Sequence, residues 1–395
     1  MTDRLYYHDA YLTTFDAAVV ARDAAGRRVY LDRTAFYPTS GGQPFDTGTL
    51  GGAAVVDVME EGDRIVHVLD APVAGDQVAG VVDWPRRFDH MQQHTGQHLL
   101  SAVIAERFGG TTVSVHFGRE SATLDLDTAA LSHAQLAEAE SLANVAVAEN
   151  RAVRVSFEEA GSAGGLRKPS EREGTLRIVT IEGLDRSACG GTHVRATGEI
   201  GPILIRKMER VKQLTRLEFL CGARAVRRAR ADADLLAMLA AGHSATPEEL
   251  PALLERQRAE LKTGASARRD LEEALSGYRA RELYAATAAD AGGRRLSVVR
   301  EPSGPIDRLR PLAQAFAALA GGVFVGVAQE PAGVLLAAAA DTGIDAGRVL
   351  KEALERQGGR GGGNQRLAQG TVKDSAAVEA VVTSLLATIG ETGVT

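Results

Sequence analysis

The stretch Gln92-Gln-His-Thr-Gly-Gln-His-Leu-Leu100 predicts a helix that carries half of a metal site. Its two histidines, His94 and His98, are four residues apart, so on a helix both rings lie on one face about one turn apart. The other half is predicted from Cys189-Gly-Gly-Thr-His193, where a thiol and an imidazole share the same spacing and two glycines allow a tight fold. Nitrogen and sulfur ligands suit zinc better than magnesium or calcium, which prefer oxygen. We therefore predict one catalytic zinc ion per chain.

A histidine pair at this spacing occurs more often on a helix surface or in a protein core than at a metal site. The second pair favours the metal, because the whole chain has only nine histidines and two cysteines. His90, one turn before His94, is a fifth candidate ligand, although a position beside the site or in solvent fits it better. Three or four protein ligands fit either a closed structural zinc or a zinc with an open position for water, and the sequence leaves that alternative open.

The composition narrows the class of protein. The chain has 395 residues, enough for two or three domains, and its 45% hydrophobic and 24% charged residues are typical of a globular protein. The net charge of -6 excludes a general basic field, so any contact with a nucleic acid must be local. Two cysteines make no disulfide framework, the N-terminus has no signal-peptide pattern, and no apolar run approaches the roughly 20 residues of a membrane span. We expect a cytoplasmic protein without a membrane partner.

Residues 1–85 read as a small antiparallel β-barrel of short strands spaced about ten residues apart, most of them separated by glycines. The expected strands are Ala18–Ala21, Arg28–Asp32, Ala54–Val58, Arg64–Leu69 and Val78–Asp83. Trp84-Pro85 then marks the entry to a helix over His90–Phe108, which Gly109-Gly110 should end.

After this helix, strands and helices alternate around an antiparallel sheet. Expected are strands at Thr112–Gly118 and Ser121–Leu126, a helix at Ser132–Asn150 that opens with capping-box spacing, and strands at Val153–Phe157, Leu176–Ile181 and Ile200–Met208. Cys221 has no histidine within four residues and is expected to be a small buried residue.

Residues 205–230 are strongly basic and contain only Glu209 and Glu218 as acids. Such a run is usually a solvated surface, but this excess beside the predicted zinc site suits a phosphate backbone. The nine basic residues are Arg206, Lys207, Arg210, Lys212, Arg216, Arg224, Arg227, Arg228 and Arg230.

Residues 223–285 are rich in alanine, leucine, arginine and glutamate and predict a helical arm. A seam from Leu250 to Tyr278 has 4-3-4-3 spacing with non-aliphatic breaks. A dimeric coiled coil and an intramolecular helical hairpin both fit this seam, and we favour an arm that can dimerise.

The remaining residues alternate strand-like and helical pieces, which is typical of an α/β domain. Expected are strands at Leu296–Val299, Val323–Ala328 and Val334–Ala340 and helices at Arg308–Leu319 and Ala346–Gln357. The glycine-rich segment Gly358–Gly363 reads as a loop. It lacks the Lys-Ser/Thr of a P-loop, which argues against nucleotide hydrolysis, and a flexible linker is the plain alternative.

The two histidine-containing motifs resemble the HxxxH and CxxxH pairs of the alanyl-tRNA synthetase editing domain and of its free-standing relatives, the AlaX proteins. Phe36–Gly48 resembles the glycine-rich signature of the small domain that precedes this site, and Gly358–Gly370 resembles the glycine-rich motif of the DHHA1 domain. These matches follow the family's order and cover most of the chain. The chain is identified as a member of the AlaX family, in a long form with a C-terminal DHHA1 domain.

The resemblance implies further site residues, although ordinary turn or strand roles explain several of them equally well. Two of them, Thr39 and Gln43, lie in the predicted loop around Gly41-Gly42. Two more, Ser114 and His116, lie on the strand expected after the His90–Phe108 helix, and all four would help to position or select the substrate. A fifth catalytic candidate is Gln97, which lies between the two helix histidines His94 and His98. The residues expected to contact RNA are Arg206, Lys207, Arg210, Lys212 and Arg216 near the site, and Asn364, Gln365 and Arg366 in the DHHA1-like domain.

The resemblance implies hydrolysis of the ester that joins a wrong amino acid, chiefly serine, to the 3′ end of tRNA(Ala). The HExxH of zinc proteases, the Cys-Pro-x-x-Cys of nucleoside deaminases and the Asp-His-His of phosphoesterases do not occur. No aminoacylation domain precedes residue 1, so we expect action in trans on charged tRNA. The alternatives are a zinc-stabilised tRNA-binding protein without catalysis and a zinc hydrolase for small amino-acid derivatives.

We therefore predict an α+β multidomain protein in four parts. These are a small glycine-rich β-barrel (1–85), a zinc-binding aminoacyl-tRNA editing domain (86–222), a helical arm (223–285) and a DHHA1-like tRNA-binding domain (286–395). A homodimer could form through the arm or the C-terminal domain.

Overall fold

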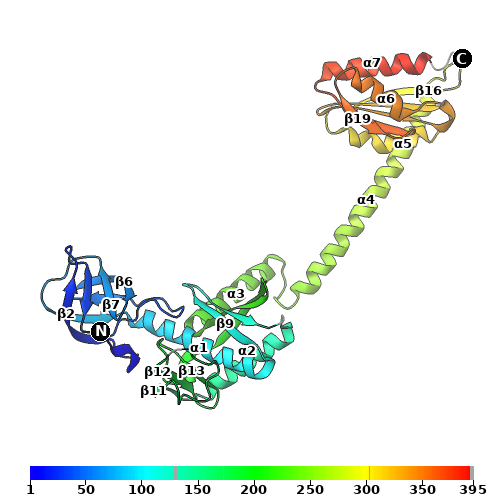
Figure 1. Ribbon diagram of the computed structural model, residues 1–395. Helices are drawn as coiled ribbons and strands as arrows, with labels where there is room; N and C mark the ends of the chain where they lie inside the picture. Colours follow the sequence, from blue (N-terminus) through cyan, green and yellow to red (C-terminus); the bar gives the residue numbers. More distant parts are fainter. Residues whose placement is uncertain (129–130, 172, 302, 392–395) are drawn as a thin grey trace. The chain divides into compact units, whose positions relative to one another are not determined.

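The computed structural model describes residues 1–128, 131–171, 173–301 and 303–391. The chain forms two compact units, Met1–Ser244 and Ala245–Thr395, and each has hydrophobic cores of its own (Figure 1). Within the described ranges, no helix combines the length and the apolar character that crossing a membrane requires.

The first unit opens with a closed barrel of six antiparallel strands (Figure 1). Its hydrogen-bonded order is β2-β3-β7-β6-β5-β8, formed by β2 (Thr14–Arg22), β3 (Arg28–Leu31), β5 (Gly48–Leu50), β6 (Ala53–Glu61), β7 (Arg64–Leu69) and β8 (Gln77–Val82). Buried residues alternate with exposed ones along β8, so that Val78, Gly80 and Val82 face the interior. All five expected strands are present. The sequence does not predict β5, because three residues beginning with glycine show no alternation.

A two-residue strand, β1 (Asp3–Arg4), pairs with β4 (Arg33–Thr34) in parallel, and the 3-10 turn η1 (Leu5–Tyr7) follows β1. This N-terminal segment matters for the site, because it brings Tyr7 against the loop that carries Cys189.

Helix α1 (Trp84–Phe108) carries the histidine pair and begins before its predicted start at His90. Asp83 caps its first turn, and Pro85 occupies a position where a helix has no use for a backbone N–H. Gly109 ends the helix in the left-handed conformation, as predicted.

A four-stranded antiparallel sheet packs against α1. Its order is β14-β15-β10-β9, formed by β9 (Thr111–Phe117), β10 (Ala122–Asp127), β14 (Ile203–Val211) and β15 (Leu214–Cys221). Leu124, Leu217 and Phe219 enter the same core as Leu99 and Leu100 of α1. The strands predicted at Thr112–Gly118 and Ser121–Leu126 and their antiparallel pairing are confirmed. The strand predicted at Ile200–Met208 begins later, at Ile203, and β15 was not predicted.

Helix α2 (His133–Ala148) also packs on this core and begins with the predicted capping box, in which Ser132 and Gln135 exchange hydrogen bonds. A second sheet contains β11 (Val153–Glu159), β12 (Thr175–Ile181) and β13 (Asp185–Ala188). Because β13 ends at Ala188, Cys189 is the first residue of the following loop, which leads to the 3-10 turn η2 (Thr197–Ile200).

Helices α3 (Gly222–Gly242) and α4 (Leu250–Ala286) account for most of the predicted arm, and the two units divide between them. The exposed large hydrophobic side chains of α4 are Leu254, Leu261, Leu271, Leu275 and Tyr278, all at predicted seam positions. Dimerisation through this seam stays a prediction.

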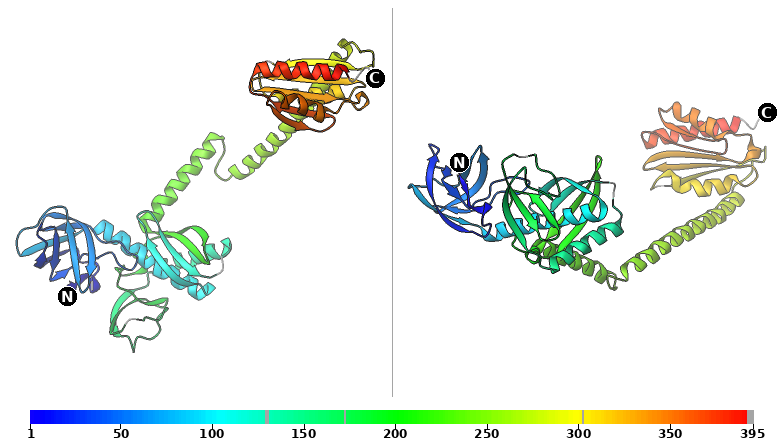
Figure 2. Two further views of the ribbon diagram at one scale, coloured as in Figure 1. Left: turned by 45° about the horizontal axis from the view of Figure 1, so that its top comes forward. Right: turned by 60° about the horizontal axis from the view of Figure 1, so that its bottom comes forward.

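The second unit contains a five-stranded sheet with helices on both faces (Figure 2). Its order is β16-β17-β18-β20-β19, formed by β16 (Arg295–Glu301), β17 (Gly322–Gln329), β18 (Ala332–Ala338), β20 (Leu367–Thr371) and β19 (Arg360–Gly363). One face packs on α6 (Ala346–Glu355) and α7 (Ser375–Glu391), the other on η3 (Ile306–Leu309), α5 (Arg310–Ala317) and the end of α4. A short 3-10 turn, η4 (Ala340–Thr342), precedes α6. The expected alternation of strands and helices is confirmed, whereas β20 and α7 were not predicted.

The prediction that Gly358–Gly363 forms a loop is wrong in part, because its last four residues form the edge strand β19. Glycines weaken strands and therefore suggest a loop, but here they let two backbones approach closely. A Cβ added at Gly361 would lie 2.6 Å from Cα of Gly370, and one at Gly363 would lie 2.2 Å from the Leu367 carbonyl oxygen. Gly361 and Gly363 are thus required by packing within the sheet.

Candidate functional site

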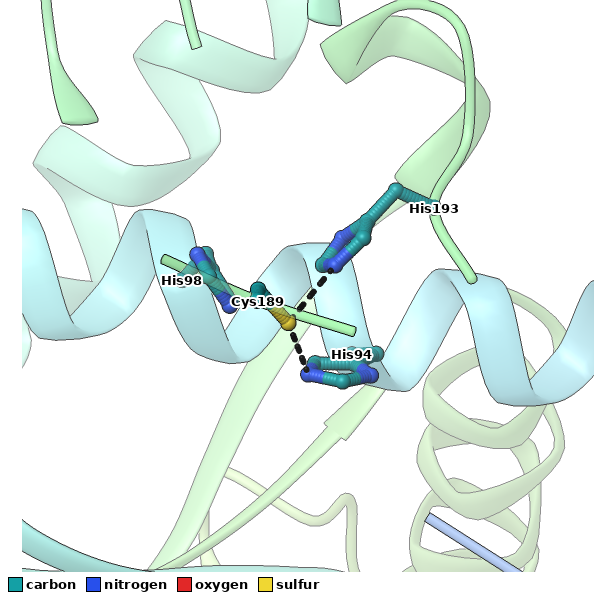
Figure 3. A group of neighbouring side chains, drawn as sticks. All are labelled: His94, His98, Cys189 and His193. Carbon is teal, nitrogen blue, oxygen red and sulfur yellow. Dashed lines mark hydrogen bonds between the residues drawn. The ribbon is translucent and has the colours of Figure 1, made fainter. Parts of the chain in front are cut away.

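The structure brings His94, His98, Cys189 and His193 together in one cluster (Figure 3). One potential ligand atom from each residue lies within 4.8 Å of all the others, and the three histidines are buried. Cys189 Sγ lies 3.4 Å from Nε2 of His94 and 3.3 Å from Nε2 of His193. Tetrahedral zinc, with bonds of about 2.3 Å to sulfur and 2.0–2.1 Å to nitrogen, places such atoms roughly 3.5 Å apart. The donor set and its spacing therefore fit a zinc ion.

Each histidine ring is held at Nδ1 by an oxygen from elsewhere in the fold. The contacts are His94 Nδ1 to Gln43 Oε1 at 2.8 Å, His98 Nδ1 to Asp185 Oδ2 at 2.9 Å and His193 Nδ1 to Thr95 Oγ1 at 3.1 Å. An imidazole whose Nδ1 is occupied in this way presents Nε2 for coordination. These contacts orient all three rings in the protein itself.

Two glycines allow the required close packing around α1. A Cβ at Gly191 would lie 2.1 Å from Cε1 of His94, so the Cys189 loop can lie against this ring only with glycine there. A Cβ at Gly96 would lie 2.2 Å from Sγ of Cys221. Cys221 is fully buried, as predicted, and packs on the core rather than in the cluster. The backbone of Cys189 is fixed by Arg177, whose Nη1 donates to its carbonyl oxygen at 2.7 Å.

The residues of the cluster shift one another's pKa values. Burial would raise the pKa of the Cys189 thiol, but the neighbouring rings of His94, His193 and His98 outweigh it and hold this pKa well below its ordinary value. Burial opposes a charge on His98, whereas Cys189 and the hydrogen bond to Asp185 raise its pKa to about 9. Burial and the His94 ring lower the pKa of His193 to about 3. The two shifts are mutual: a charge on Cys189 favours the protonated form of His98, and the histidine rings favour the thiolate.

Gln43 lies behind the cluster and is fully buried. Its Oε1 accepts from His94 and from the Thr192 N–H, and its Nε2 donates to Thr192 Oγ1. The structure thus places Gln43 where it positions a predicted ligand. Thr39 is exposed on the same loop, and its hydroxyl accepts from the Phe45 N–H.

The remaining catalytic candidates are Gln97 on α1 and Ser114 and His116 on β9. Gln97 is buried on α1 and donates to Ser101 Oγ at 2.8 Å. Ser114 and His116 are exposed on β9. Ser114 donates to Asp125 Oδ2 at 2.7 Å, so its hydroxyl belongs to a polar network on the sheet.

The expected excess of positive charge over residues 205–230 is largely neutralised, which corrects the sequence-based count. Six of the nine basic side chains form ion pairs, namely Arg206–Glu218, Lys207–Glu209, Arg216–Asp125, Arg224–Asp89, Arg228–Asp232 and Arg230–Asp234. Four of these acids lie outside the segment, two of them on elements far away in the sequence, where a local charge count does not find them. Arg216 in particular makes two hydrogen bonds to Asp125. Across the described ranges, no ion pair is found for Arg210, Lys212 or Arg227.

The candidates Asn364, Gln365 and Arg366 belong to the second unit and form the turn between β19 and β20. Asn364 Oδ1 accepts from the backbone N–H groups of Arg366 and Leu367, which explains an asparagine at this position. All three side chains are exposed.

Sequence reasoning missed Asp185, which supports His98 and is itself held by Arg167 at 2.7 Å. Burial would raise the pKa of Asp185, but the contacts with His98 and Arg167 lower it. An acid four residues before Cys189 is the one local signal that could have suggested it. Thr95 was also missed, because its neighbours in sequence do not reveal a contact with His193.

Comparisons with known proteins match two parts of the chain to family models. Residues 176–218 match the "Threonyl and Alanyl tRNA synthetase second additional domain", and residues 299–391 match the "DHHA1 domain". The first match contains Cys189 and His193.

Relatives in sequence fall into two groups. The alanine–tRNA ligase of Pyrococcus abyssi is 31% identical over 98% of this chain, which spans 43% of that ligase. The alanyl-tRNA editing protein AlaX-M of Methanosarcina acetivorans is 39% identical over 53% of this chain and 94% of its own length. Among solved structures, the C-Ala domain of Aquifex aeolicus alanyl-tRNA synthetase aligns with 25% of this chain and 94% of that chain at 22% identity, with a TM-score of 0.23, which is too weak to assign a fold.

Proposed function

Because the chain belongs to the AlaX family of alanyl-tRNA editing proteins and carries a DHHA1 domain, we propose that it deacylates mischarged tRNA(Ala), chiefly seryl-tRNA(Ala). The observation that carries this proposal is the cluster of His94, His98, Cys189 and His193, whose spacing fits zinc. We keep the proposed division into four parts. These are the barrel (1–85), the editing domain (86–222), the arm (223–285) and the DHHA1-like domain (286–395).

When zinc is bound, it supplies a Lewis acid that can polarise an ester carbonyl or orient a reacting group. The chain's own residues supply the geometry. Gln43, Thr95 and Asp185 fix the three rings, so the donors are arranged before the substrate arrives. An aminoacyl ester is labile, and orientation within such a site contributes a large part of the acceleration.

Discrimination between serine and alanine requires a polar partner for the seryl hydroxyl. A site that hydrogen-bonds this hydroxyl leaves a buried group unpaired when alanine binds, which rejects the correct product more strongly than size can. Thr39, Ser114 and His116 are our candidates for this role. The loop of Thr39 docks on the strand of the other two, since Gly42 O accepts from the Phe117 N–H at 3.2 Å.

The direct test compares release of serine from seryl-tRNA(Ala) with release of alanine from alanyl-tRNA(Ala) by the zinc-loaded protein. We expect fast loss of serine and little loss of alanine. A protein that cleaves neither ester would remove the catalytic proposal, and equal cleavage of both would remove the proposed selectivity.

A second function, a zinc-stabilised tRNA-binding protein without catalysis, is favoured by one observation. The cluster offers four protein donors, the number that structural zinc sites use when they leave no open position. In both functions tRNA(Ala) is the proposed partner. The proposed RNA contacts remain Arg206, Lys207, Arg210, Lys212 and Arg216, with Asn364, Gln365 and Arg366. Arg210 and Lys212 are the stronger candidates of the first group, because they form no ion pair within the described residues.

Replacing Gln43 by alanine should weaken zinc binding by about 10- to 100-fold, the usual effect of losing a group that orients a ligand. The His94 ring loses its acceptor at Nδ1. Competition with a chromophoric chelator measures the change. The matched variant Gln97→Ala should keep the affinity of the unchanged protein, because Gln97 bonds to Ser101 instead. Equal losses in both variants would contradict this role of Gln43.

Zinc affinity should increase with pH between pH 6 and pH 8, by about tenfold per pH unit for each proton displaced. The pKa of His98 is about 9 in the metal-free cluster, so below that pH zinc must displace its proton. The neighbouring histidine rings hold the pKa of the Cys189 thiol well below its ordinary value, so zinc displaces a proton from this thiol more easily than from a free one. Chelator competition at several pH values provides the measurement. An affinity that does not change over this range would contradict a protonated His98.

A further inference from the structure

A cavity of about 620 Å³ lies in the first unit where the barrel loop, the start of α1 and the start of α3 meet. Its lining includes four arginines, one acid and one histidine, namely Arg86, Arg119, Arg224, Arg227, Asp89 and His90. Nothing in the sequence motifs or in the metal cluster accounts for this concentration of guanidinium groups.

The cavity is basic because one carboxylate faces four guanidinium groups. Arg224 makes hydrogen bonds of 2.6–3.0 Å to Asp89, and its positive charge neutralises that carboxylate. Arg86 donates to the Phe45 carbonyl oxygen, a neutral partner. Over the residues that the structure describes, Arg86, Arg119 and Arg227 form no ion pair. Three positive charges thus remain without a counter-charge on a concave surface, where they attract an anion.

His90 adds a neutral polar group. Its side chain is only 4% exposed, and Nδ1 has no hydrogen-bond partner in the described part of the chain. Burial, with a smaller contribution from Arg86, lowers the pKa of His90 to about 4, so the ring is neutral at pH 7 and keeps one N–H donor. A buried polar atom without a partner is costly, and a ligand or water bound beside it would offset this cost.

The start of α3 supplies backbone donors to the same cavity. Ala223 in its first turn lines the space, and the N-cap residue Cys221 makes no side-chain hydrogen bond to this turn. By contrast, the first turn of α1 is capped by Asp83. Uncapped N–H groups and the positive end of a helix dipole favour a phosphate.

Three residues of the cavity lining, His90, Gly118 and Pro44, lie close in sequence to His94 or to residues that contact it. His90 precedes His94 by one helical turn, a rise of about 6 Å. Gly118 follows Phe117, whose ring centroid lies 4.9 Å from that of His94. Pro44 follows Gln43, which hydrogen-bonds to His94. Residues that line the cavity are thus neighbours in sequence of residues that contact His94.

We propose that this cavity binds a backbone phosphodiester of single-stranded RNA and so directs the 3′ end of the strand to the cluster. The inference rests on the proposed function for the identity of the strand, but the anion site follows from the lining residues. Guanidinium groups with uncapped helix N–H groups are a typical combination for phosphate. The site is separate from the paired basic residues of β14 and β15.

The test uses the full-length protein and an RNA hairpin that carries no amino acid. The hairpin has the acceptor-stem sequence of tRNA(Ala) and its single-stranded 3′ end. Fluorescence anisotropy gives the affinity at several salt concentrations. Arg227→Gln and Arg119→Gln should each weaken binding by about tenfold near 0.1 M salt. Each should also reduce the slope of log affinity against log salt by about 0.7, the value for one lost contact with a single strand. Both side chains are exposed, so these variants should fold.

Two further variants sharpen the result. His90→Leu removes a neutral donor and should weaken binding without changing the salt slope. Arg27→Gln makes the same change in charge in the exposed turn between β2 and β3 and should bind as the unchanged protein does.

Unchanged binding by Arg227→Gln and Arg119→Gln would overturn the proposal. So would an equal loss in Arg27→Gln, which would indicate diffuse attraction to the whole surface. If the two cavity variants lose affinity for adenosine monophosphate but not for the hairpin, the cavity is a mononucleotide site and the proposal is wrong. Because the hairpin carries no aminoacyl ester, binding through the cavity by a protein that hydrolyses nothing would reject only the proposed deacylase function.

Discussion

The variant Cys189→Ala should lose more than about a hundredfold in the rate of serine release from seryl-tRNA(Ala), together with its bound zinc. Loss of a group that only orients a ligand already reduces metal affinity or activity by about 10- to 100-fold, and loss of a ligand should exceed this. Sγ of Cys189 contacts Nε2 of both His94 and His193 and is the one sulfur of the cluster. Single-turnover kinetics and metal content per chain measure the two effects.

The control is Cys221→Ala, the same chemical change at the second cysteine of the chain. Cys221 is buried against Gly96, so this variant should lose some stability but keep its zinc and its activity. Full activity of Cys189→Ala would exclude a catalytic role for the cluster. If Cys189→Ala instead loses zinc and its fold together, the site is structural, and the tRNA-binding alternative becomes the better account.

Replacing Asp46 by alanine should lower the free energy of unfolding of the first unit by about 3–5 kcal/mol, the usual effect of removing one partner of a buried ion pair. The side chains of Asp46 and Arg87 are both 0% exposed. Arg87 also donates to the carbonyl oxygens of Ala10 and Ala35, so it joins the start of α1 to the barrel segment. Without Asp46, its charge would stay buried and uncompensated.

Urea unfolding followed by tryptophan fluorescence reports on this region, because the sequence has a single tryptophan, Trp84, at the first residue of α1. The control Asp76→Ala removes a carboxylate that is 96% exposed and paired with Arg22, and it should hardly change the transition. Equal transitions for Asp46→Ala and the unchanged protein would show that the buried pair contributes little.

Features with a short sequence signature could be predicted. The i,i+4 spacing of His94 and His98, the glycine stop at Gly109 and the cap at Ser132 each depend on contacts within a helical turn. The alternating strands of the barrel follow from local pattern as well. The start of α1 was misplaced, because the apolar stripe begins later than the helix that Asp83 caps.

Features that depend on distant contacts could not be predicted. Gln43 meets His94 across 51 residues, and Asp185 meets His98 across 87. The ion pair between Arg216 and Asp125 spans 91 residues, so a local count of charges overstated the basic surface. These contacts are decided by which strands and loops are neighbours in the fold, and a single sequence gives no distance between them.

The oxygens of Gln43, Asp185 and Thr95 that hold the three histidine rings belong to the folded chain and do not depend on the ion. Zinc fingers, by contrast, fold only when they bind their metal. We therefore expect a chelator to remove the metal from this cluster without unfolding the chain. If the proposed activity depends on zinc, returning the ion should then restore it without a refolding step.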